Sequence, residues 1–340
     1  MSENINQPFK TQTRIEWLDI AKGLGVLLVV LGHLWYECSF PIVNQIIYSF
    51  HMPMFFILSG FIFKKGTSKF GSFIVTKSKR LLLPTVVFFV LGVIFLKLIS
   101  TNESSATILK KFFFIDGICP YNDPCWYFIS LFQLIIVSYF LNLDKAPYLL
   151  KVLTIVITFI FGLILYEFEI YIPFGLNRTI IAMVFFSLGS LFGQANREGK
   201  KIQKKSLKFI ILISCTGIWL LFGIFLNKKV SFYGMDLGNY FFFVIAGICG
   251  SILFVELCKL LQKTKIKFFL IKTAHNSIII IGTHYFLKAI FEIIMNRLNL
   301  FKTWSYCLIV ILFSIFITLI YNLISPFLNK YFPAITGNLK

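Results

Sequence analysis

The sequence predicts an all-α integral membrane protein with about ten transmembrane helices and both termini in the cytoplasm. Three observations lead to this fold class. Of the 340 residues, 58% are hydrophobic, 42 are Phe and only 14% are charged, at a mean hydropathy of +0.83. Apolar runs of about 20 residues, the length that crosses a hydrocarbon core of roughly 30 Å, recur along the whole chain. Basic residues gather in alternate loops.

The ten apolar runs give the expected spans in chain order. They cover residues 17–36, 44–63, 82–99, 126–142, 149–166, 175–194, 207–226, 238–258, 272–291 and 305–326. Residues 1–16 and 327–340 are then cytoplasmic tails, and 17–326 forms one polytopic domain without an internal repeat. The polar N-terminus shows no removable signal peptide, so we expect the first span to stay as an anchor.

The formal net charge of +19 follows topology and does not indicate a nucleic-acid partner. One set of alternate loops, together with both tails, holds 23 of the 33 Lys and Arg residues, the opposite set holds 9, and Lys22 lies inside a span. This asymmetry is the positive-inside signature and predicts cytoplasmic termini. The basic loops also suit the anionic headgroups of membrane lipids.

Three polar residues interrupt the first span. At 100° per residue, Lys22 and His33 share one helix face about 16 Å apart, and Asp19 joins the same stripe. An ionisable side chain that faces lipid costs several kcal/mol, so a stripe of three indicates a functional site. The alternative is an Asp19–Lys22 ion pair near the interface with His33 as a packing residue.

The second span carries polar residues in the run FHMPMFFILSGF. Pro53 is expected to bend this helix and to leave a carbonyl without its donor. His51 lies about a third of the way in from the outside. It either approaches His33 or bonds to the carbonyl that Pro53 frees, and Ser59 follows two turns later.

Further candidates lie at other span ends. Lys77 and Arg80 precede the third span, where they can bind phosphate oxygens or act only as topology determinants. Arg178 begins the sixth span, and His284 lies midway through the ninth, where it is either functional or a structural histidine bonded across helices. The sequence has no HExxH, CxxC, phosphate-loop or GxSxG motif, and no metal site is expected.

Cys119 and Cys125 share an outward loop and could form a disulfide if the outside is oxidising, although spacing alone does not fix their geometry.

Five runs carry a family resemblance: LDIAKGLGVLLVVLGH, FHMPMFFILSGF, KRLLLP, WYFISLF and NRTIIAMVFFSLG. From about Arg14 to Ser325 the chain resembles the membrane acyltransferase-3 family of bacterial O-acyltransferases. The resemblance implies transfer of an acyl group, usually acetyl, from cytoplasmic acyl-coenzyme A to a sugar hydroxyl. The acceptor is then a surface polysaccharide or its lipid-linked precursor, in the bacterial inner membrane. Acyl-coenzyme A is a co-substrate, and no tightly bound cofactor is expected.

The family pattern also implies residue roles. Its basic residue and histidine map onto Lys22 and His33, and its arginine before the third span maps onto Arg80. Lys22 keeps the charge of the usual Arg without its bidentate fork. His33 is then the general base, because an imidazole suits proton transfer at neutral pH. Asp19 orients Lys22 or Arg80, the donor phosphates meet Arg14, Lys22, Lys77 and Arg80, and the acceptor side involves His51, Trp126 and Arg178. Two further acceptor-side candidates come from the residues themselves: His284 from its depth in the span, and Ser59 as one possible stabiliser of the oxyanion beside His51 or a backbone amide.

Two other classes of function stay open. A transporter or flippase for lipid-linked saccharides would use the polar stripe as a translocation path, although the chain lacks an evident inverted repeat. A membrane-embedded sensory or partner domain would tolerate replacement of Lys22 and His33. The sequence indicates neither the acceptor sugar nor the oligomeric state.

Overall fold

The computed structural model describes residues 15–67, 69–98, 104–115, 119–120, 122–200, 204–228, 230–301 and 303–337, so the candidate donor ligand Arg14 lies outside the described residues. Within these ranges the chain is helical apart from one β-bridge between Ser231 and Asp236. Ten helical segments are long and apolar enough to cross a membrane. The all-α, ten-span fold class is therefore confirmed, whereas the membrane orientation stays a prediction.

The spans have the following bounds. They are Glu16–Leu34 (α1), Pro41–Ile62 (α2, Pro41–Tyr48, and α3, His51–Ile62), Phe70–Leu98 (α4), Asp123–Phe140 (which contains α6, Trp126–Phe140), Tyr148–Glu167 (α7), Leu176–Arg197 (α8), Lys205–Phe225 (which contains α9, Lys205–Trp219), Tyr240–Leu261 (α10), Ser277–Arg297 (α12) and Trp304–Tyr331 (α13). Three shorter helices are α5 (Ser105–Lys110), α11 (Ile266–His275) and α14 (Pro333–Thr336).

Successive spans alternate in direction, which sorts the connections onto two faces. We call the end with the connections 63–69, 141–147, 198–204 and 262–265 the basic face, because it holds most of the Lys and Arg residues. The other end, with the connections 35–40, 99–122, 168–175, 226–239 and 298–303, is the opposite face.

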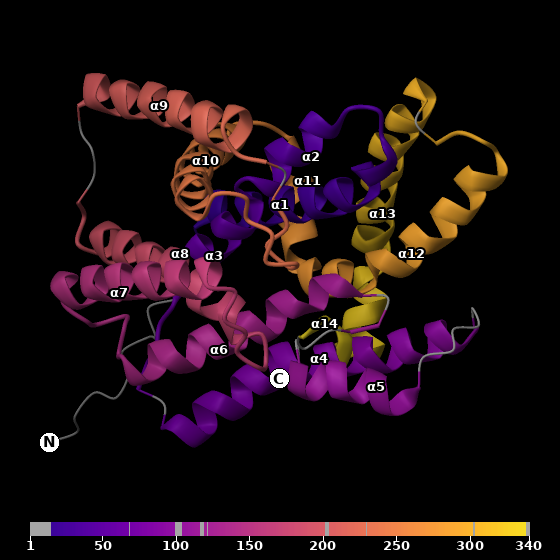
Figure 1. Cartoon of the computed structure of the whole chain (residues 1–340), viewed down its shortest axis with the longest axis horizontal. Coiled ribbons are helices and arrows are strands. Elements are labelled where there is room, and N and C mark those ends of the chain that lie inside the picture. The colour runs from indigo at the N-terminus through magenta and orange to yellow at the C-terminus, as the bar shows by residue number, and fades with distance from the viewer. Residues whose placement is uncertain are drawn as a thin grey trace, which may run out of the picture.

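Helix α1 lies inside the bundle, packed against α3, α10, α11, α12 and α13. A Cβ atom on Gly23 would lie 1.9 Å from the carbonyl oxygen of Leu270, so only glycine lets α11 approach α1 this closely. Figure 1 shows α9 at one edge of the molecule and α4 with α5 at the opposite edge. In the most apolar stretch of α7 only 22% of the residues are buried, and in that of the span Lys205–Phe225 only 11%. These values are expected for spans that face lipid.

The second span is interrupted between α2 and α3, at Ser49 and Phe50. Pro53 is the third residue of α3, in the first turn, where a missing backbone donor is tolerated. The His51 imidazole bonds through Nδ1 to the carbonyl of Ile47 at 2.9 Å. The bend therefore falls one turn before Pro53, and His51 satisfies a carbonyl at the end of α2 rather than the one that Pro53 frees.

Three helices extend beyond the predicted spans. Helix α4 begins at Phe70, twelve residues before the expected start, so Lys77 and Arg80 lie within a helix and not in a loop before it. The last span continues through Pro326 to Tyr331. The ninth span is preceded by the separate helix α11. At the break between the two helices, Asn276 Nδ2 donates a hydrogen bond to Asn322 Oδ1 at 2.8 Å. Hydropathy marks the apolar stretch of a helix, whereas its hydrogen bonds continue into the interface.

The connection after α4 folds back onto the bundle at the opposite face. Phe112 stacks on Phe89 of α4 with ring centroids 4.1 Å apart, and the Asn122 amide donates to the Gly282 carbonyl of α12. Cys119 and Cys125, both buried, lie beside each other as free thiols. This connection closes over the end of α6 and forms part of the site described below.

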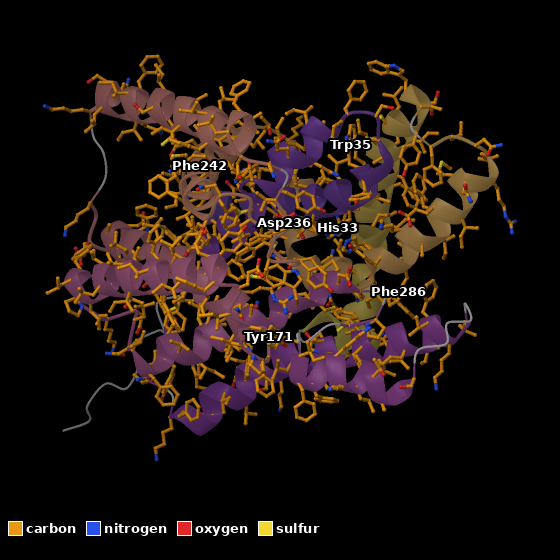
Figure 2. All side chains as sticks on the ribbon, in the orientation of Figure 1. His33, Trp35, Tyr171, Asp236, Phe242 and Phe286 are labelled. Atoms are coloured by element: carbon orange, nitrogen blue, oxygen red, sulfur yellow. The ribbon has the colours of Figure 1, made fainter. Side chains whose placement is uncertain are left out.

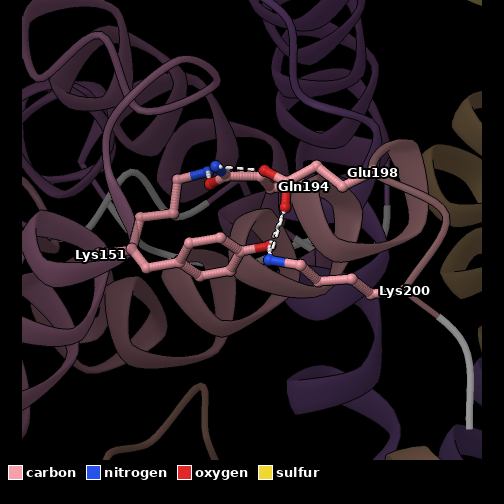
Figure 3. Close-up of polar contacts among 5 residues, drawn as sticks. Lys151, Gln194, Glu198 and Lys200 are labelled. Carbon is pink, nitrogen blue, oxygen red and sulfur yellow. Dashed lines mark hydrogen bonds and ion pairs between the residues drawn. The ribbon is translucent and has the colours of Figure 1, made fainter.

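A polar cluster joins α7 to α8 at the basic face (Figure 3). Lys151 is fully buried, and its ammonium donates to Gln194 Oε1 at 2.6 Å. Gln194 Nε2 donates in turn to Glu198, which also accepts from Tyr148 and pairs with Lys200 at 2.7 Å. Lys200, followed by Tyr148 and Gln194, lowers the pKa of Glu198 to about 2. The carboxylate therefore keeps its charge, and the link between the helices, at any neutral pH.

Candidate active site

Two histidines from distant parts of the chain meet near the opposite face. His33, in the last turn of α1, has its Nδ1 atom 2.8 Å from Nε2 of His284 on α12, and the two rings stack with centroids 5.1 Å apart. The residues are 251 positions apart in the sequence. Helices α1 and α11–α12 run parallel here, because Glu16 pairs with Lys267 at 2.9 Å, Gly23 packs on Leu270, and His33 meets His284 in the same order along both.

The contacts of His284 determine the tautomers of both rings. His284 Nδ1 lies 2.8 Å from the Ile280 carbonyl and 3.1 Å from the Ile281 carbonyl, and since carbonyls only accept, this nitrogen carries the proton. His284 is 1% exposed, which favours a neutral ring whose Nε2 is an acceptor. His33 Nδ1 is then the donor, and His33 Nε2 retains an unshared electron pair.

His33 lines a cavity of about 380 Å³ that we call the His33 cavity. Its walls come from α1, α2, α12, the connection before α6 and the connection 226–239, and include Tyr48, Asp123, Trp126, Tyr233 and Tyr285. His284 does not line this cavity. The Nδ1 edge of the His33 ring faces His284, which leaves Nε2 as the ring nitrogen available to a ligand in the cavity.

A larger cavity of about 930 Å³, the outer cavity, adjoins the His33 cavity and shares Tyr233 and Asp236 with it. It lies between the connections 168–175 and 226–239 at the opposite face and is also lined by Arg178. Figure 2 shows Asp236 next to His33 near the middle of the molecule, with Tyr171, another outer-cavity residue, farther away. The side chains of Tyr233 and Asp236 therefore stand between the outer cavity and the cavity that holds the imidazole.

The structure brings His51 and Trp126 to the same place as His33. All three line a recess of about 50 Å³ beneath the His33 cavity, together with Tyr48 and Tyr127. Since His51 bonds to a carbonyl through Nδ1, its Nε2 is an acceptor in the neutral ring. His51 therefore lies beside His33, as the first alternative predicts, whereas the second is wrong because the carbonyl that it contacts is that of Ile47 and not the one that Pro53 frees.

Ser59 and Arg178 take different positions from those expected of direct ligands. Ser59 lies behind the recess, where its hydroxyl donates to the Phe55 carbonyl at 2.8 Å and lies 3.3 Å from the Tyr127 oxygen. Arg178 is 3% exposed, and its guanidinium lies 5.6 Å from the Trp126 ring and 5.5 Å from the Tyr233 ring. Its Nη1 donates to the Tyr233 carbonyl at 3.1 Å, so Arg178 positions the aromatic walls of the two cavities.

The remaining candidates lie toward the basic face. Asp19 and Lys22 are half-buried on α1, and the helix is unbroken to Leu34, so Lys22 lies about 16 Å along the axis from His33. Lys77 and Arg80 are on α4, which packs mainly against α6, α12 and α14. Arg80 is exposed, and its backbone contacts the C-terminal segment at Gly337.

A cavity of about 410 Å³ also opens toward the basic face, between α1, α3, α8 and α10. Trp17, Glu256 and Lys259 line its mouth, where Glu256 pairs with Lys259 at 2.5 Å and also with Lys208. The walls deeper in are apolar. Trp17, Glu256 and Lys259 were not predicted as site residues, because a Lys–Glu pair at a span end is typical of any membrane helix.

Sequence reasoning also missed most of the walls of the His33 cavity. Tyr48, Tyr233 and Tyr285 resemble the many other aromatic residues of this chain, and Asp123 and Asp236 lie in connections without a motif. The one available signal was the aromatic cluster before Trp126, which is typical of a segment at a membrane interface.

The fold and the site define a multi-pass membrane protein in which a cavity-lining histidine is held by a second, buried histidine. A family model described as "Acyltransferase domain" matches residues 15–323. The chain therefore belongs to the acyltransferase-3 family and is a membrane acyltransferase. No curated protein and no solved structure matches it.

Proposed function

We propose that this protein transfers an acyl group, most often acetyl, from acyl-coenzyme A to a sugar hydroxyl of a surface polysaccharide or its lipid-linked precursor. The basic face is in the cytoplasm of a bacterial cell, and the opposite face meets the glycan. The observation that supports this best is the histidine pair. His33 presents an unprotonated Nε2 to a cavity that opens at the glycan side, which is what a general base for a hydroxyl needs.

His33 can carry out both proton transfers of the reaction without a second base. Nε2 takes the proton of the acceptor hydroxyl as its oxygen attacks the thioester carbonyl and forms the new C–O bond. The tetrahedral intermediate then loses coenzyme A as the C–S bond breaks, and the imidazolium returns the proton to the thiolate. His284 holds the ring and its tautomer and touches neither substrate, so it is a positioning residue.

The oxyanion of the intermediate needs a hydrogen-bond donor. We assign this role to Tyr48, which lines both the recess and the His33 cavity and whose ring lies 6.2 Å from the His33 ring and 5.0 Å from the His51 ring. Neutral His51 cannot donate from Nε2, and the Ser59 hydroxyl is engaged elsewhere. The Tyr285 ring lies closer to the His33 ring, at 5.0 Å, but it lines the His33 cavity alone, whereas Tyr48 lines both the cavity and the recess.

The donor comes from the basic face. Its phosphates meet Lys22, with Asp19 as an orienting partner, and the cations Lys77 and Arg80 contribute from α4. Its pantetheine arm covers the distance of about 16 Å along α1 that separates Lys22 from His33.

The test supplies labelled acetyl-coenzyme A to membranes that contain the wild type or His33→Ala and follows label into polysaccharide. We expect label with the wild type and a loss of at least about 100-fold with His33→Ala. His275→Ala is the matched control, because His275 is an exposed histidine on α11 outside the cavities. Equal labelling by wild type and His33→Ala would overturn the assignment. No label with any donor, together with loss of surface glycan on deletion, would instead favour a transporter.

A further inference from the structure

The described walls of the two cavities carry more acidic than basic side chains, although the chain as a whole is basic. The sequence holds 33 Lys and Arg residues against 14 Asp and Glu. Among the described residues, the walls of the outer cavity and the His33 cavity hold four carboxylates and one cation, Arg178. The carboxylates are Asp123, Glu167, Glu169 and Asp236.

The cation in these walls faces protein groups. The Arg178 guanidinium is buried against two aromatic rings and donates to a backbone carbonyl. Lys288, which acts electrostatically on Asp123, pairs with Glu292 at 3.2 Å. By contrast Glu167, Glu169 and Asp236 are exposed. A ligand in the outer cavity therefore meets acidic groups first.

The connection that carries Asp236 is built to hold it in place. Ser231 and Asp236 exchange two backbone hydrogen bonds, of 2.6 and 3.0 Å. At the base of the connection, Asn227 accepts from the backbone of Lys228 and Asn239 and donates to the carbonyl of Leu237. Asp236 and Tyr233 therefore keep their positions at the junction of the two cavities.

Carboxylates select the chemistry of what they can bind. An ionised carboxylate only accepts hydrogen bonds, so it pairs with hydroxyl or ammonium donors and cannot pair with another carboxylate or a phosphate diester. The tyrosines supply ring faces, because the Tyr166 and Tyr171 hydroxyls donate to the backbone carbonyls of Gly238 and Ile115. Acceptors and aromatic faces of this kind fit sugar rings that bear hydroxyl or amino groups, which are the donors.

We infer that the four wall carboxylates restrict the acceptor to glycan without negative charge at the acylated unit, either neutral or amine-bearing, and exclude uronate, sialate and phosphate-bearing units. This inference rests on the proposed acyl transfer. It adds the sign of the charge that the acceptor can carry, and it assigns this selectivity to Asp123, Glu167, Glu169 and Asp236.

The first experiment determines the charge of the product. Native membranes are labelled with acetyl-coenzyme A, the glycan is released from any lipid with mild acid and cut with glycosidases to single sugar units, and the labelled units are applied to an anion exchanger at neutral pH. We expect the label in the unbound fraction. Retention of the label would overturn the inference and leave the acyl transfer itself intact.

The second experiment needs no catalysis. Purified wild type is compared with the double variant Glu169→Lys, Asp236→Lys for binding of oligogalacturonate. We expect at least about fivefold tighter binding by the variant, since one charge pair at 4 Å in water is worth roughly a factor of five. The double variant Glu16→Lys, Glu198→Lys, at the basic face, matches the change in net charge and should bind like the wild type. Equal binding by all three proteins would overturn the inference even if acyl transfer is confirmed.

Discussion

Replacement of His284 tests whether the histidine pair works as the structure indicates. In His284→Ala, His33 loses the acceptor that lies 2.8 Å from its Nδ1. The His33 ring is then free to exchange tautomers, and a protonated Nε2 in the cavity cannot take the hydroxyl proton. A hydrogen bond between neutral groups contributes about 0.5–1.5 kcal/mol, and a buried donor without a partner costs about 1–3 kcal/mol. A bias of about 1.4–2.8 kcal/mol within this range lowers kcat roughly 10- to 100-fold.

The assay is the initial rate of labelled acetyl transfer as a function of acceptor concentration. Since His284 does not line the cavities, kcat should fall while KM for the acceptor changes less than about twofold. His284→Gln should recover part of the rate, because the amide oxygen can accept from His33 Nδ1. His275→Ala, which removes an exposed histidine, should behave like the wild type.

Melting temperatures of the purified variants separate this effect from unfolding. The reasoning is refuted if folded His284→Ala keeps kcat within twofold of the wild type. It is equally refuted if the Gln and Ala variants lose the same rate, because then the acceptor atom at this position has no role.

Three further predictions follow from other contacts. Tyr48→Phe should lower kcat by about 100-fold with little change in melting temperature, because it removes the proposed oxyanion donor; unchanged kcat would exclude that role. Gly23→Ala should destabilise the protein by about 1–3 kcal/mol or more, because the new Cβ would lie 1.9 Å from the Leu270 oxygen. Gly217→Ala is the control, because the space around Gly217 is open. Equal melting temperatures for the two variants would contradict the close packing of α1 and α11. Gln194→Leu should lower stability by about 1–3 kcal/mol in a detergent melt, because the buried Lys151 ammonium loses its acceptor at 2.6 Å and keeps, among the described residues, only the Ser190 carbonyl at 3.4 Å.

Basic and acidic side chains are distributed unequally between the two ends of the protein. Cations gather at the basic face, where a phosphate-bearing donor is expected, and carboxylates line the cavities at the other end. Between them α1 carries Lys22 and His33 on one face of a single helix. The same element therefore reaches from the proposed donor side to the proposed acceptor side.

Local sequence properties determined the class of fold and part of the site. Apolar length is a property of each segment alone, so the ten spans could be predicted from hydropathy. Helical periodicity likewise placed Asp19, Lys22 and His33 on one stripe of α1. The five motif runs indicated the family that the match over residues 15–323 confirms.

Only the tertiary structure decided what His33 touches. The partner His284 lies 251 residues away, and their contact depends on parallel packing that the absence of a side chain at Gly23 permits. The walls of the His33 cavity come from helices and connections that share no pattern. Contacts across helices depend on how side-chain shapes fit in three dimensions, which spacing along one helix does not encode. The sequence thus determined which helix carries the imidazole, and packing determined which of its nitrogens is engaged by His284.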